Sequence, residues 1–589
     1  MINAIFRIKL VALIFPVTWF IGLVLLQLSL STALLAAPDI TITGLSAEQE
    51  ANVRAYLPLS RETCSSPRWK VTRLFEQSPK QVQQALHALG YYHPKIGKAL
   101  EWEEECWSSA FSIEPGAAML ISLVDIQVLG AGSSEGFFSE LLQKNSIKQG
   151  DIVNHGTYDD LKKRLQALAN AKGYFDSHFE LKQLIVDPDK NRAEIRLHLQ
   201  TGRRYYISRL ELDENALSVE FSSQYLTIKP NQAYDRDNII KSHQQLDFAE
   251  YFQDIQLKFL KSQAINYHAP LQVKLRNLPQ HVLSAGVGYD TDLGFRLSAG
   301  YKNRYLNDSG HKFIADLNLS LKKSNLLLEY IWPLSNPLKD RLSFFAGITY
   351  EDTDHVDSQK IDLGIKLSNK LYGQLIMAEQ LNFVAERYRN AESDPFETRF
   401  LLVPGISLSN VRAAKDELYV NGYKYLFKLN GAHRKVGSGV SFIQAQLNIK
   451  FAYATLWGGR ILVDNNFGAT GVDIFADLPS SYRFYAGGDN SVRGYDYKSI
   501  GQRDENGEVI GGRYLVTTSL EYEQQIVGNW SLAAFIDAGD AFSKDIDMQV
   551  GVGVGLRWYS LVGPLRVDIA MPTEDWSDVH FHFSLSTAL

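Results

Sequence analysis

The second half of the chain alternates apolar and polar residues in one run after another, and this pattern constrains the fold most. From about His281 onward the periodicity expected of helices disappears. Successive side chains on a β-strand point to opposite faces, so each run describes a strand with one apolar and one polar face. Clear examples are residues 313–321, 550–559, 565–571 and 579–586.

About sixteen such runs follow one another between residues 280 and 589. An even number is typical of a single-chain outer-membrane barrel, whose strands turn an apolar face to lipid and a polar face to a wet lumen. The alternative is a soluble β-sandwich, which does not need charged strand faces opposite an apolar band that continues through the whole region. We therefore expect residues 280–589 to form a transmembrane β-barrel of antiparallel strands.

The region between Asp39 and about Pro279 repeats itself at an interval near 80 residues. Gly90-Tyr-Tyr is echoed by Gly173-Tyr-Phe, and more weakly by Glu250-Tyr-Phe. The middle copy predicts the order strand, helix, helix, strand, strand, with Thr157 as the N-cap of its second helix. Any small α+β repeat has a similar pattern. We expect three modules, at residues 38–121, 122–202 and 203–279.

Residues 1–37 have the pattern of an export signal. Arg7 and Lys9 precede an uncharged run that ends in Ala33-Leu-Leu-Ala-Ala37. We expect cleavage after Ala36 or Ala37, with a retained membrane anchor as the alternative. No later stretch approaches the ~18 consecutive apolar residues of a transmembrane helix. The net charge of −6 also argues against a nucleic-acid binder, because such proteins normally carry a basic face.

The two cysteines, Cys64 and Cys106, both fall in the first module. In an oxidising compartment they predict a disulfide, and the alternative is a pair of buried thiols. The spacing of the cysteines does not suggest a metal site.

A search for catalytic motifs finds no Gly-x-Ser-x-Gly, His-Glu-x-x-His or phosphate-binding loop. Gly551-Val-Gly-Val-Gly555 has glycines like those of a nucleotide loop, but the alternation around it places it within a strand. His580 and His582 lack a convergent third ligand, so we interpret them as polar lumen positions rather than a metal site. We expect no enzymatic activity, no cofactor and no metal.

The remaining feature is a turn-rich segment around Val492-Arg493-Gly494-Tyr495. An arginine beside glycine in a series of barrel strands suggests a loop that folds back into the lumen. A guanidinium pairs best with carboxylates held in fixed geometry. Glu521 and Asp537 lie in the following strands, and alternation places Asp537 on the face opposite Leu532, Ala534 and Ile536. We expect these acids to hold Arg493 inside the barrel.

These motifs resemble those of a known superfamily. Val492-Arg493-Gly494-Tyr495 is similar to the sixth-loop signature of the bacterial outer-membrane assembly barrels, and the repeated modules resemble POTRA (polypeptide transport-associated) domains. The hairpin at residues 286–296, Phe484-Tyr-Ala-Gly-Gly-Asp489 and Gly563-Pro-Leu-Arg-Val-Asp568 are also similar to family motifs. Among the relatives, BamA proteins carry five POTRA modules and two-partner (TpsB-like) transporters carry two. Three modules therefore favour the TamA family, the outer-membrane subunits of the translocation and assembly module.

The resemblance implies a non-enzymatic role in inserting or secreting autotransporters and other outer-membrane proteins. It implies a Gram-negative outer membrane with its lipid around the barrel, POTRA modules in the periplasm and a TamB-like inner-membrane-anchored partner. A weak seam is expected between the first strand, at Gly286, Gly288 and Tyr289, and the last strand, at Phe581 and Phe583. One departure is the end of the chain, since family barrels commonly end on or near an aromatic residue and here Phe583 is followed by six more residues. The alternatives are a two-partner secretion transporter and a passive channel.

Overall fold

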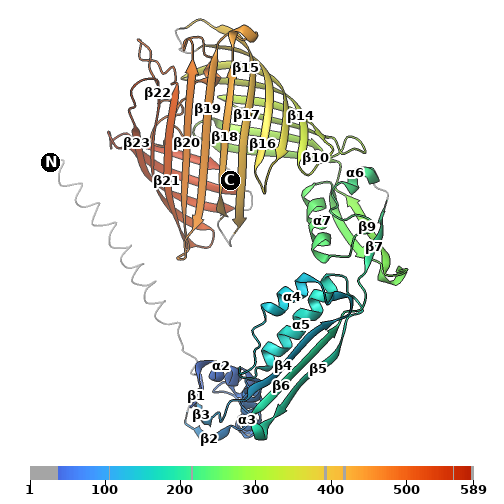
Figure 1. The fold of residues 1–589 in the computed structure, drawn as a ribbon. Coiled ribbons are helices and arrows are strands. Elements are labelled where there is room, and N and C mark those ends of the chain that lie inside the picture. Colours follow the sequence, from blue (N-terminus) through green and yellow to red (C-terminus); the bar gives the residue numbers. More distant parts are fainter. Residues whose placement is uncertain are drawn as a thin grey trace, which may run out of the picture. The chain divides into compact units, whose positions relative to one another are not determined.

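The computed structural model describes residues 37–104, 106–213, 216–389, 394–415, 420–560 and 563–585. Three small sheets come first in the chain, and a closed β-barrel follows them (Figure 1). The predicted signal, residues 1–37, lies outside the described residues except for Ala37. Within the described part of the chain, no helix combines the length and apolar character needed to cross a membrane.

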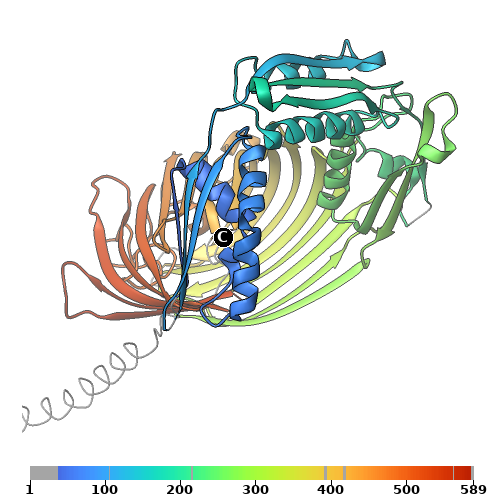
Figure 2. The same ribbon diagram turned by 90° about the horizontal axis from the view of Figure 1, so that it is seen from below.

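The first module packs two helices against one three-stranded sheet of order β1-β3-β2. The long helix α3 lies along one face of this sheet (Figure 2), and the core between them contains Val71, Val82 and Phe111. Cys64 and Cys106 are joined by a disulfide, which closes a loop between residues 42 positions apart. The elements are β1 Asp39–Thr43, α2 Ala47–Tyr56, α3 Arg68–Ala88, β2 Lys95–Trp102 and β3 Trp107–Glu114.

The middle module has the predicted order of elements, with sheet order β4-β6-β5. The predicted cap of its second helix is wrong. Helix α5 begins at His155, and the Asn154 side chain accepts hydrogen bonds from the N–H groups of Gly156 and Thr157. Asn154 therefore holds the N-cap position, and Thr157 lies inside the first turn. The elements are β4 Leu120–Leu129, α4 Gly136–Gln143, α5 His155–Ala171, β5 His178–Asp187 and β6 Arg192–Gln200.

The third module repeats the arrangement, with sheet order β7-β9-β8. Its core includes Phe221, Leu246 and Tyr251. The Tyr251 hydroxyl donates to the carbonyl of Gly310 at 2.6 Å, so the core reaches the first turns of the barrel. The elements are β7 Tyr206–Leu212, α6 Val219–Ser223, α7 Arg236–Phe248, β8 Phe252–Phe259 and β9 His268–Asn277.

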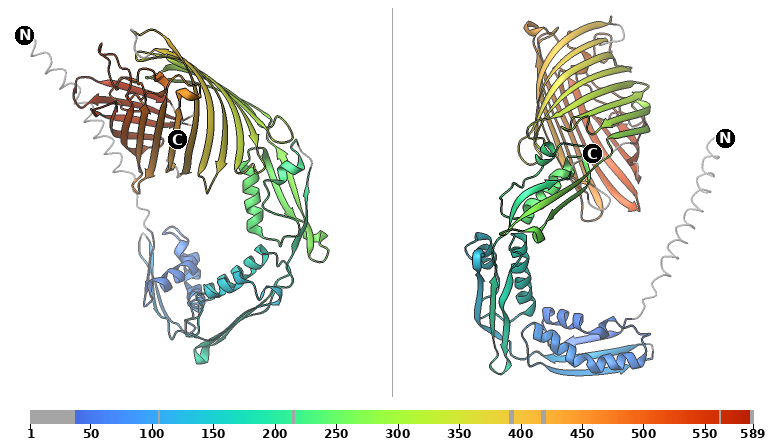
Figure 3. Two further views of the ribbon diagram at one scale, coloured as in Figure 1. Left: turned by 45° about the horizontal axis from the view of Figure 1, so that its top comes forward. Right: turned by 90° about the vertical axis from the view of Figure 1, so that its right-hand side faces the viewer.

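Sixteen strands, β10 to β25, close into an antiparallel barrel, which Figure 3 shows with tilted strands. The predicted fold class is confirmed. The strands are β10 His281–Asp290, β11 Gly294–Asn303, β12 Lys312–Ser320, β13 Lys323–Pro333, β14 Asp340–Thr353, β15 Val356–Lys370, β16 Ile376–Arg389, β17 Glu397–Lys415, β18 Val420–Ala432, β19 Phe442–Ala454, β20 Gly459–Val472, β21 Tyr514–Val527, β22 Trp530–Phe542, β23 Gln549–Ser560, β24 Gly563–Pro572 and β25 His580–Leu585.

The two faces of the barrel wall differ as the alternation predicts. Leu297, Leu319 and Ile348 are exposed on the outer face. The side chains of Arg460 and Arg557 are almost completely buried on the inner face, where they pair with acids. Since apolar side chains face outward and charged ones inward, the wall suits lipid outside and a polar lumen inside.

Candidate functional site

The longest described connection between barrel strands runs from residue 473 to residue 513, between β20 and β21, and we call it the lumen loop. Val492 is completely buried and packs with Ala486 and Ile500, and Tyr495 lies against this cluster. Gly494 has a φ of 91°, a conformation that non-glycine residues rarely adopt, so glycine is needed beside the arginine. The small apolar core holds the loop in one conformation and directs Arg493 toward the wall.

Arg493 is 6% exposed and donates to carboxylates on three different strands. Its Nε and Nη2 donate to the two oxygens of Asp537 at 2.7 and 3.0 Å. Its Nη1 donates to Glu521 at 2.7 Å and to Asp568 at 3.1 Å. The guanidinium carbon also lies 3.3 Å from the centre of the Phe535 ring. The structure therefore brings Arg493 together with both acids expected from the sequence, and a third acid completes the set.

Asp568 and Arg557 are the members of this site that the sequence reasoning missed. Arg557 is completely buried and donates from Nε to Glu521 at 3.1 Å and from Nη2 to Asp568 at 3.1 Å. The signal was available, because Asp568 alternates with Leu565, Val567 and Ile569 and so shares the lumen face. Two arginines and three acids form one buried network, which we call the lumen lock.

The buried charges of the lumen lock depend on one another. Desolvating an isolated ion costs several kcal/mol, and the attraction between partners offsets this only when the geometry is good. Asp537 accepts a paired set of donors from Arg493 and a further bond from its backbone N–H at 3.1 Å. Removing one partner leaves the others buried and unpaired, so the loop and the wall are stabilised together.

The glycines of β23 make room for this network. A Cβ atom at Gly551 would lie 1.8 Å from the carbonyl oxygen of Arg493, and one at Gly555 would lie 1.7 Å from the Asp568 carboxylate. The run of glycines thus lets the lumen loop approach β23 and leaves room for the carboxylate of Asp568 on the neighbouring strand. This agrees with placing the run in a strand rather than in a nucleotide-binding loop.

The seam, where β10 meets β25, has little backbone pairing. β10 forms ten residue pairs with β11 but one with β25, between Asp290 and Ser584. Two further bonds join the N–H of Thr291 to the carbonyl of Phe583 and the N–H of Phe583 to the Thr291 hydroxyl, each at 3.2 Å. The described parts of the two strands therefore meet at the end of β10 and not along its length.

The predicted seam residues are placed differently from one another. Gly286 and Gly288 pair with Ser298 and Arg296 of β11, and neither has a residue pair with β25. They lie earlier on β10, and the pairing with β25 begins only where β10 ends. Tyr289 does reach the seam, with its ring 6.0 Å from that of Phe583.

Phe581 is 66% exposed on the outer face of β25. The strand has six residues and pairs along that length with β24. The last strand is therefore held by one neighbour along its length.

Side chains from the lumen loop bridge the seam. Asp489 accepts from the Thr291 hydroxyl at 2.9 Å and bonds to Nδ1 of His582. The Nε2 atom of His582 lies 2.9 Å from the backbone nitrogen of Gly494, which can only donate. This assigns the ring hydrogen to Nδ1, which donates to Asp489. The first hairpin, the lumen loop and the last strand thus meet at two side chains.

Asp292, Asp489 and His582 together have the residue types of a metal site, with ligand atoms within 4.8 Å of one another. Both ring nitrogens of His582 are already used, however, and the carboxylate of Asp292 accepts the N–H of Asp489 at 2.8 Å. A metal on Nδ1 would put a hydrogen on Nε2, facing the N–H of Gly494. The arrangement therefore fits a hydrogen-bonded latch better than an ion site.

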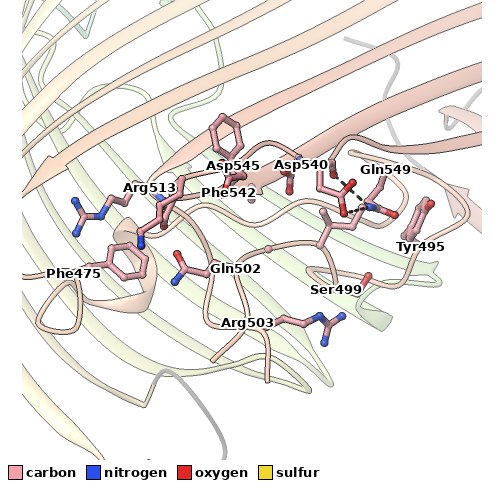
Figure 4. Close-up of a pocket in the computed structure, with 16 residues that line it drawn as sticks. Phe475, Tyr495, Ser499, Gln502, Arg503, Arg513, Asp540, Phe542, Asp545 and Gln549 are labelled. Atoms are coloured by element: carbon pink, nitrogen blue, oxygen red, sulfur yellow. Dashed lines mark hydrogen bonds between the residues drawn. The ribbon is translucent and has the colours of Figure 1, made fainter. Parts of the chain in front are cut away.

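A pocket of about 810 Å³ lies between the lumen loop and the ends of β22 and β23 (Figure 4). The Oδ2 atom of Asp540 accepts the N–H of Asp547 at 2.7 Å. The lining charges are balanced, with three basic and three acidic side chains, so the pocket has no clear preference for a charged ligand. These side chains are Arg503, Arg513, Lys544, Asp540, Asp545 and Asp547.

The fold and the lumen lock define the class of protein, which is a sixteen-stranded outer-membrane-type barrel preceded by three small α+β modules. Residues 306–589 match the Omp85 superfamily domain, and residues 39–115 match the POTRA domain described as TamA domain 1. The chain is therefore similar to the Omp85 superfamily domain over residues 306–589 and to a POTRA domain over residues 39–115.

Two relatives are outer membrane protein assembly factors BamA. The protein from Neorickettsia risticii is 21% identical, in a match that covers 78% of this chain and 64% of the relative. The protein from Nitratidesulfovibrio vulgaris is 23% identical, in a match that covers 65% of this chain and 51% of the relative. The chain thus spans between about half and two thirds of the length of these relatives.

A solved structure of BamA from Haemophilus ducreyi lacking POTRA domains 1–3 has the same fold. Its TM-score is 0.66 at 15% identity, and the match covers 79% of this chain and 99% of that structure.

Proposed function

We propose that this protein is a TamA-type outer-membrane subunit that assists the insertion or secretion of autotransporters and other outer-membrane proteins without enzymatic chemistry. Its barrel would lie in the outer membrane of a Gram-negative bacterium, with the POTRA-like modules in the periplasm. The Omp85 superfamily domain supports an assembly or secretion barrel, and the match of the first module to a TamA POTRA domain supports the narrower assignment.

The single residue pair at the seam carries this proposal. Unpaired backbone donors and acceptors are costly in lipid, so a strand edge that opens there recruits another strand. An incoming client strand can satisfy β10 and β25 by strand addition. The step needs no external energy source, because bonds lost at the seam are replaced by bonds to the client.

The edges of the small sheets support the proposed partners. β2, β5 and β8 each lie at the edge of a three-stranded sheet. Such edges can accept an extended segment of a client or of a TamB-like partner anchored in the inner membrane. A pulldown from outer membranes that recovers a large periplasm-spanning protein is expected. Deletion of the first two modules removes the edges of β2 and β5 and should weaken this recovery.

A reversible crosslink across the seam tests the mechanism. The double variant Asp290→Cys/Ser584→Cys places thiols at the one paired position of β10 and β25. Oxidation should stop client assembly, and a reducing agent should restore it. Each single variant controls for loss of the native side chain. Client assembly at the normal rate with the seam fully crosslinked would contradict the proposal.

Two other functions are distinguishable. A two-partner secretion transporter would export one dedicated secreted partner, and a passive channel would conduct ions. The lumen loop, locked inside the barrel through Arg493, argues against an open pore. Single-channel recordings of Arg493→Ala should show a conductance change without a client defect if the protein is a channel.

A further inference from the structure

A basic pocket lies where the third module meets the first turns of the barrel. It has a volume of about 780 Å³ and is lined by residues of α7 and by the ends of β11, β12, β14 and β15. The two parts are in direct contact, because Lys312 donates to the carbonyl of Ala249 at 3.0 Å and Tyr251 donates to that of Gly310. Five cations line the pocket: Lys302, Lys312, Lys339, Arg341 and Lys370.

The strand register shows which side of the barrel wall these cations face. Arg341 pairs with Pro333 on one side and with Ser368 on the other, and Lys302 pairs with Ile314. These positions alternate with the exposed apolar residues of the same strands, such as Leu297, Phe344 and Ile365. Because the exposed residues face outward, the cations of the strands face the lumen. The pocket therefore opens to the aqueous mouth of the barrel and not to lipid.

The positive charge of this mouth is largely uncompensated. Glu250 is the acid in the lining, and it is ion-paired with Lys302 at 2.5 Å. Lys312 lies over the Tyr251 ring at 4.1 Å. Among the described residues, Lys339, Arg341 and Lys370 have no carboxylate in ion-pair contact, although the whole chain carries a net charge of −6. An excess of cations in a concave site attracts anionic ligands and concentrates them there.

Apolar side chains lie beside these cations. Phe248, at the end of α7, is 82% exposed, and Leu371, in the turn after β15, is 51% exposed. Both line the pocket, together with Ile314 and Ile331. A ligand for this site therefore needs negative charge and apolar groups close together. An extended acidic polypeptide with alternating apolar residues meets both conditions. The volume of the pocket also lies within the ~300–1,000 Å³ that is typical of pockets that hold ligands.

We propose that the pocket formed by α7 and the lumen mouth binds an acidic, partly apolar segment of a client polypeptide as it passes from the third module to the barrel. This inference rests on the proposed function and names the part of the client that the mouth recognises. Lipid headgroups have similar charge, but the lumen orientation of the cations favours a chain that approaches through water.

Binding of a defined peptide to the full-length protein in detergent tests this site. The probe is a fluorescent eight-residue peptide of alternating aspartate and leucine, with asparagine replacing aspartate in the neutral control. Fluorescence anisotropy should show binding of the acidic probe that weakens as salt is raised. The double variant Arg341→Gln/Lys370→Gln should bind it about tenfold more weakly, since each partly exposed ion pair contributes modestly.

A matched control separates the pocket from general charge effects. Lys241→Gln/Lys258→Gln removes the same charge from exposed positions of the third module that do not line the pocket, and it should bind like the wild type. The reversed variant Arg341→Glu/Lys370→Glu should instead prefer a lysine-leucine peptide. Retention of the heat-resistant folded barrel in each variant shows that the fold is intact.

Several results would overturn the proposal. One is equal peptide binding by the pocket variant and the wild type. A second is an equal loss in the control variant. A third is Arg341-dependent binding of phosphatidylglycerol nanodiscs, relative to phosphatidylcholine nanodiscs, without binding of the peptide. The titration measures peptide binding alone, so its result does not depend on the seam crosslink. Normal client assembly with a crosslinked seam would contradict the proposed function. Equal peptide binding by the pocket variant and the wild type would contradict only this inference.

Discussion

Arg493 of the lumen loop donates hydrogen bonds to both carboxylate oxygens of Asp537 on β22, from Nε at 2.7 Å and from Nη2 at 3.0 Å. This fork joins a loop to a wall strand 44 residues further along the chain. The geometry requires two donors in one plane, which arginine has and lysine lacks. The docked state of the loop therefore depends on the identity of this side chain and not only on its charge.

Replacing Arg493 should undock the lumen loop. Arg493→Gln leaves Asp537 and Glu521 buried without their main donor, which we expect to cost about 3–5 kcal/mol. Arg493→Lys should recover part of this, because a single ammonium cannot serve both oxygens of Asp537. Limited proteolysis within residues 473–513 and the barrel's unfolding temperature in detergent measure the effect. Arg503→Gln, at an exposed arginine of the same loop, is the control; equal resistance of Arg493→Gln and the wild type to proteolysis would show that the lock does not hold the loop.

His582 should control how tightly the seam closes. Its two nitrogens serve different partners, Asp489 and Gly494. His582→Asn retains a donor near the Nδ1 position and His582→Gln an acceptor near Nε2, whereas His582→Phe retains neither. Each lost bond leaves a buried group unpaired and should cost roughly 1–3 kcal/mol.

Hydrogen exchange at β10 and β25 measures this opening. We expect the fastest exchange for His582→Phe and intermediate rates for the two amide variants. A substitution at His580, whose ring lies 22% exposed near Asp578, is the matched control on the same strand. Unchanged exchange in His582→Phe would show that the hydrogen bonds of His582 do not hold the seam closed.

Gly551→Ala should displace the lumen loop without removing any charge. The added Cβ would lie 1.8 Å from the Arg493 carbonyl oxygen, which belongs to the backbone and cannot move aside alone. The expected result is the same sensitivity to proteolysis as in Arg493→Gln. Gly347→Ala on β14, where a Cβ has its nearest neighbours at 3.8 Å, should behave like the wild type. If Gly551→Ala resists proteolysis like the wild type, β23 must be able to shift and accommodate the added Cβ without displacing the lumen loop.

His155 makes the contact between the first two modules depend on pH. The Tyr92 hydroxyl lies 2.7 Å from His155 Nε2. Burial lowers the pKa of His155, opposed by Asp159 and assisted by His87. The folded state therefore favours the neutral ring, and its contribution to stability is present above the ordinary value of about 6.5 and is lost as pH falls below it.

The protection of the amides at the start of α5, taken relative to their base-catalysed intrinsic exchange rates, should accordingly fall between pH 7.5 and 5.5. His155→Gln should flatten this dependence, and His178→Gln, at an exposed histidine, should leave it intact. A profile that is the same in His155→Gln and the wild type would assign the pH effect to another group.

The sequence alone determined the architecture, because strand alternation indicates the two faces of each strand and an 80-residue repeat indicates the modules. Both patterns are visible in the sequence without knowledge of the tertiary contacts. The sequence also led to Arg493, Glu521 and Asp537, since alternation assigns a residue to a face. It could not determine which faces meet. Asp568 and Arg557 join the lumen lock, and Asp489 meets His582, only because the loop enters the lumen and closure places β25 near the first hairpin.

The same limit applies to the seam, where Gly286 and Gly288 of β10 have no residue pair with β25. Their backbone pairing depends on the register and length of the contact between β10 and β25, two strands about 300 positions apart in the chain. Register across such a separation is set by barrel closure and by the side chains of the lumen loop, which are contacts of the tertiary structure and leave no local periodicity to read.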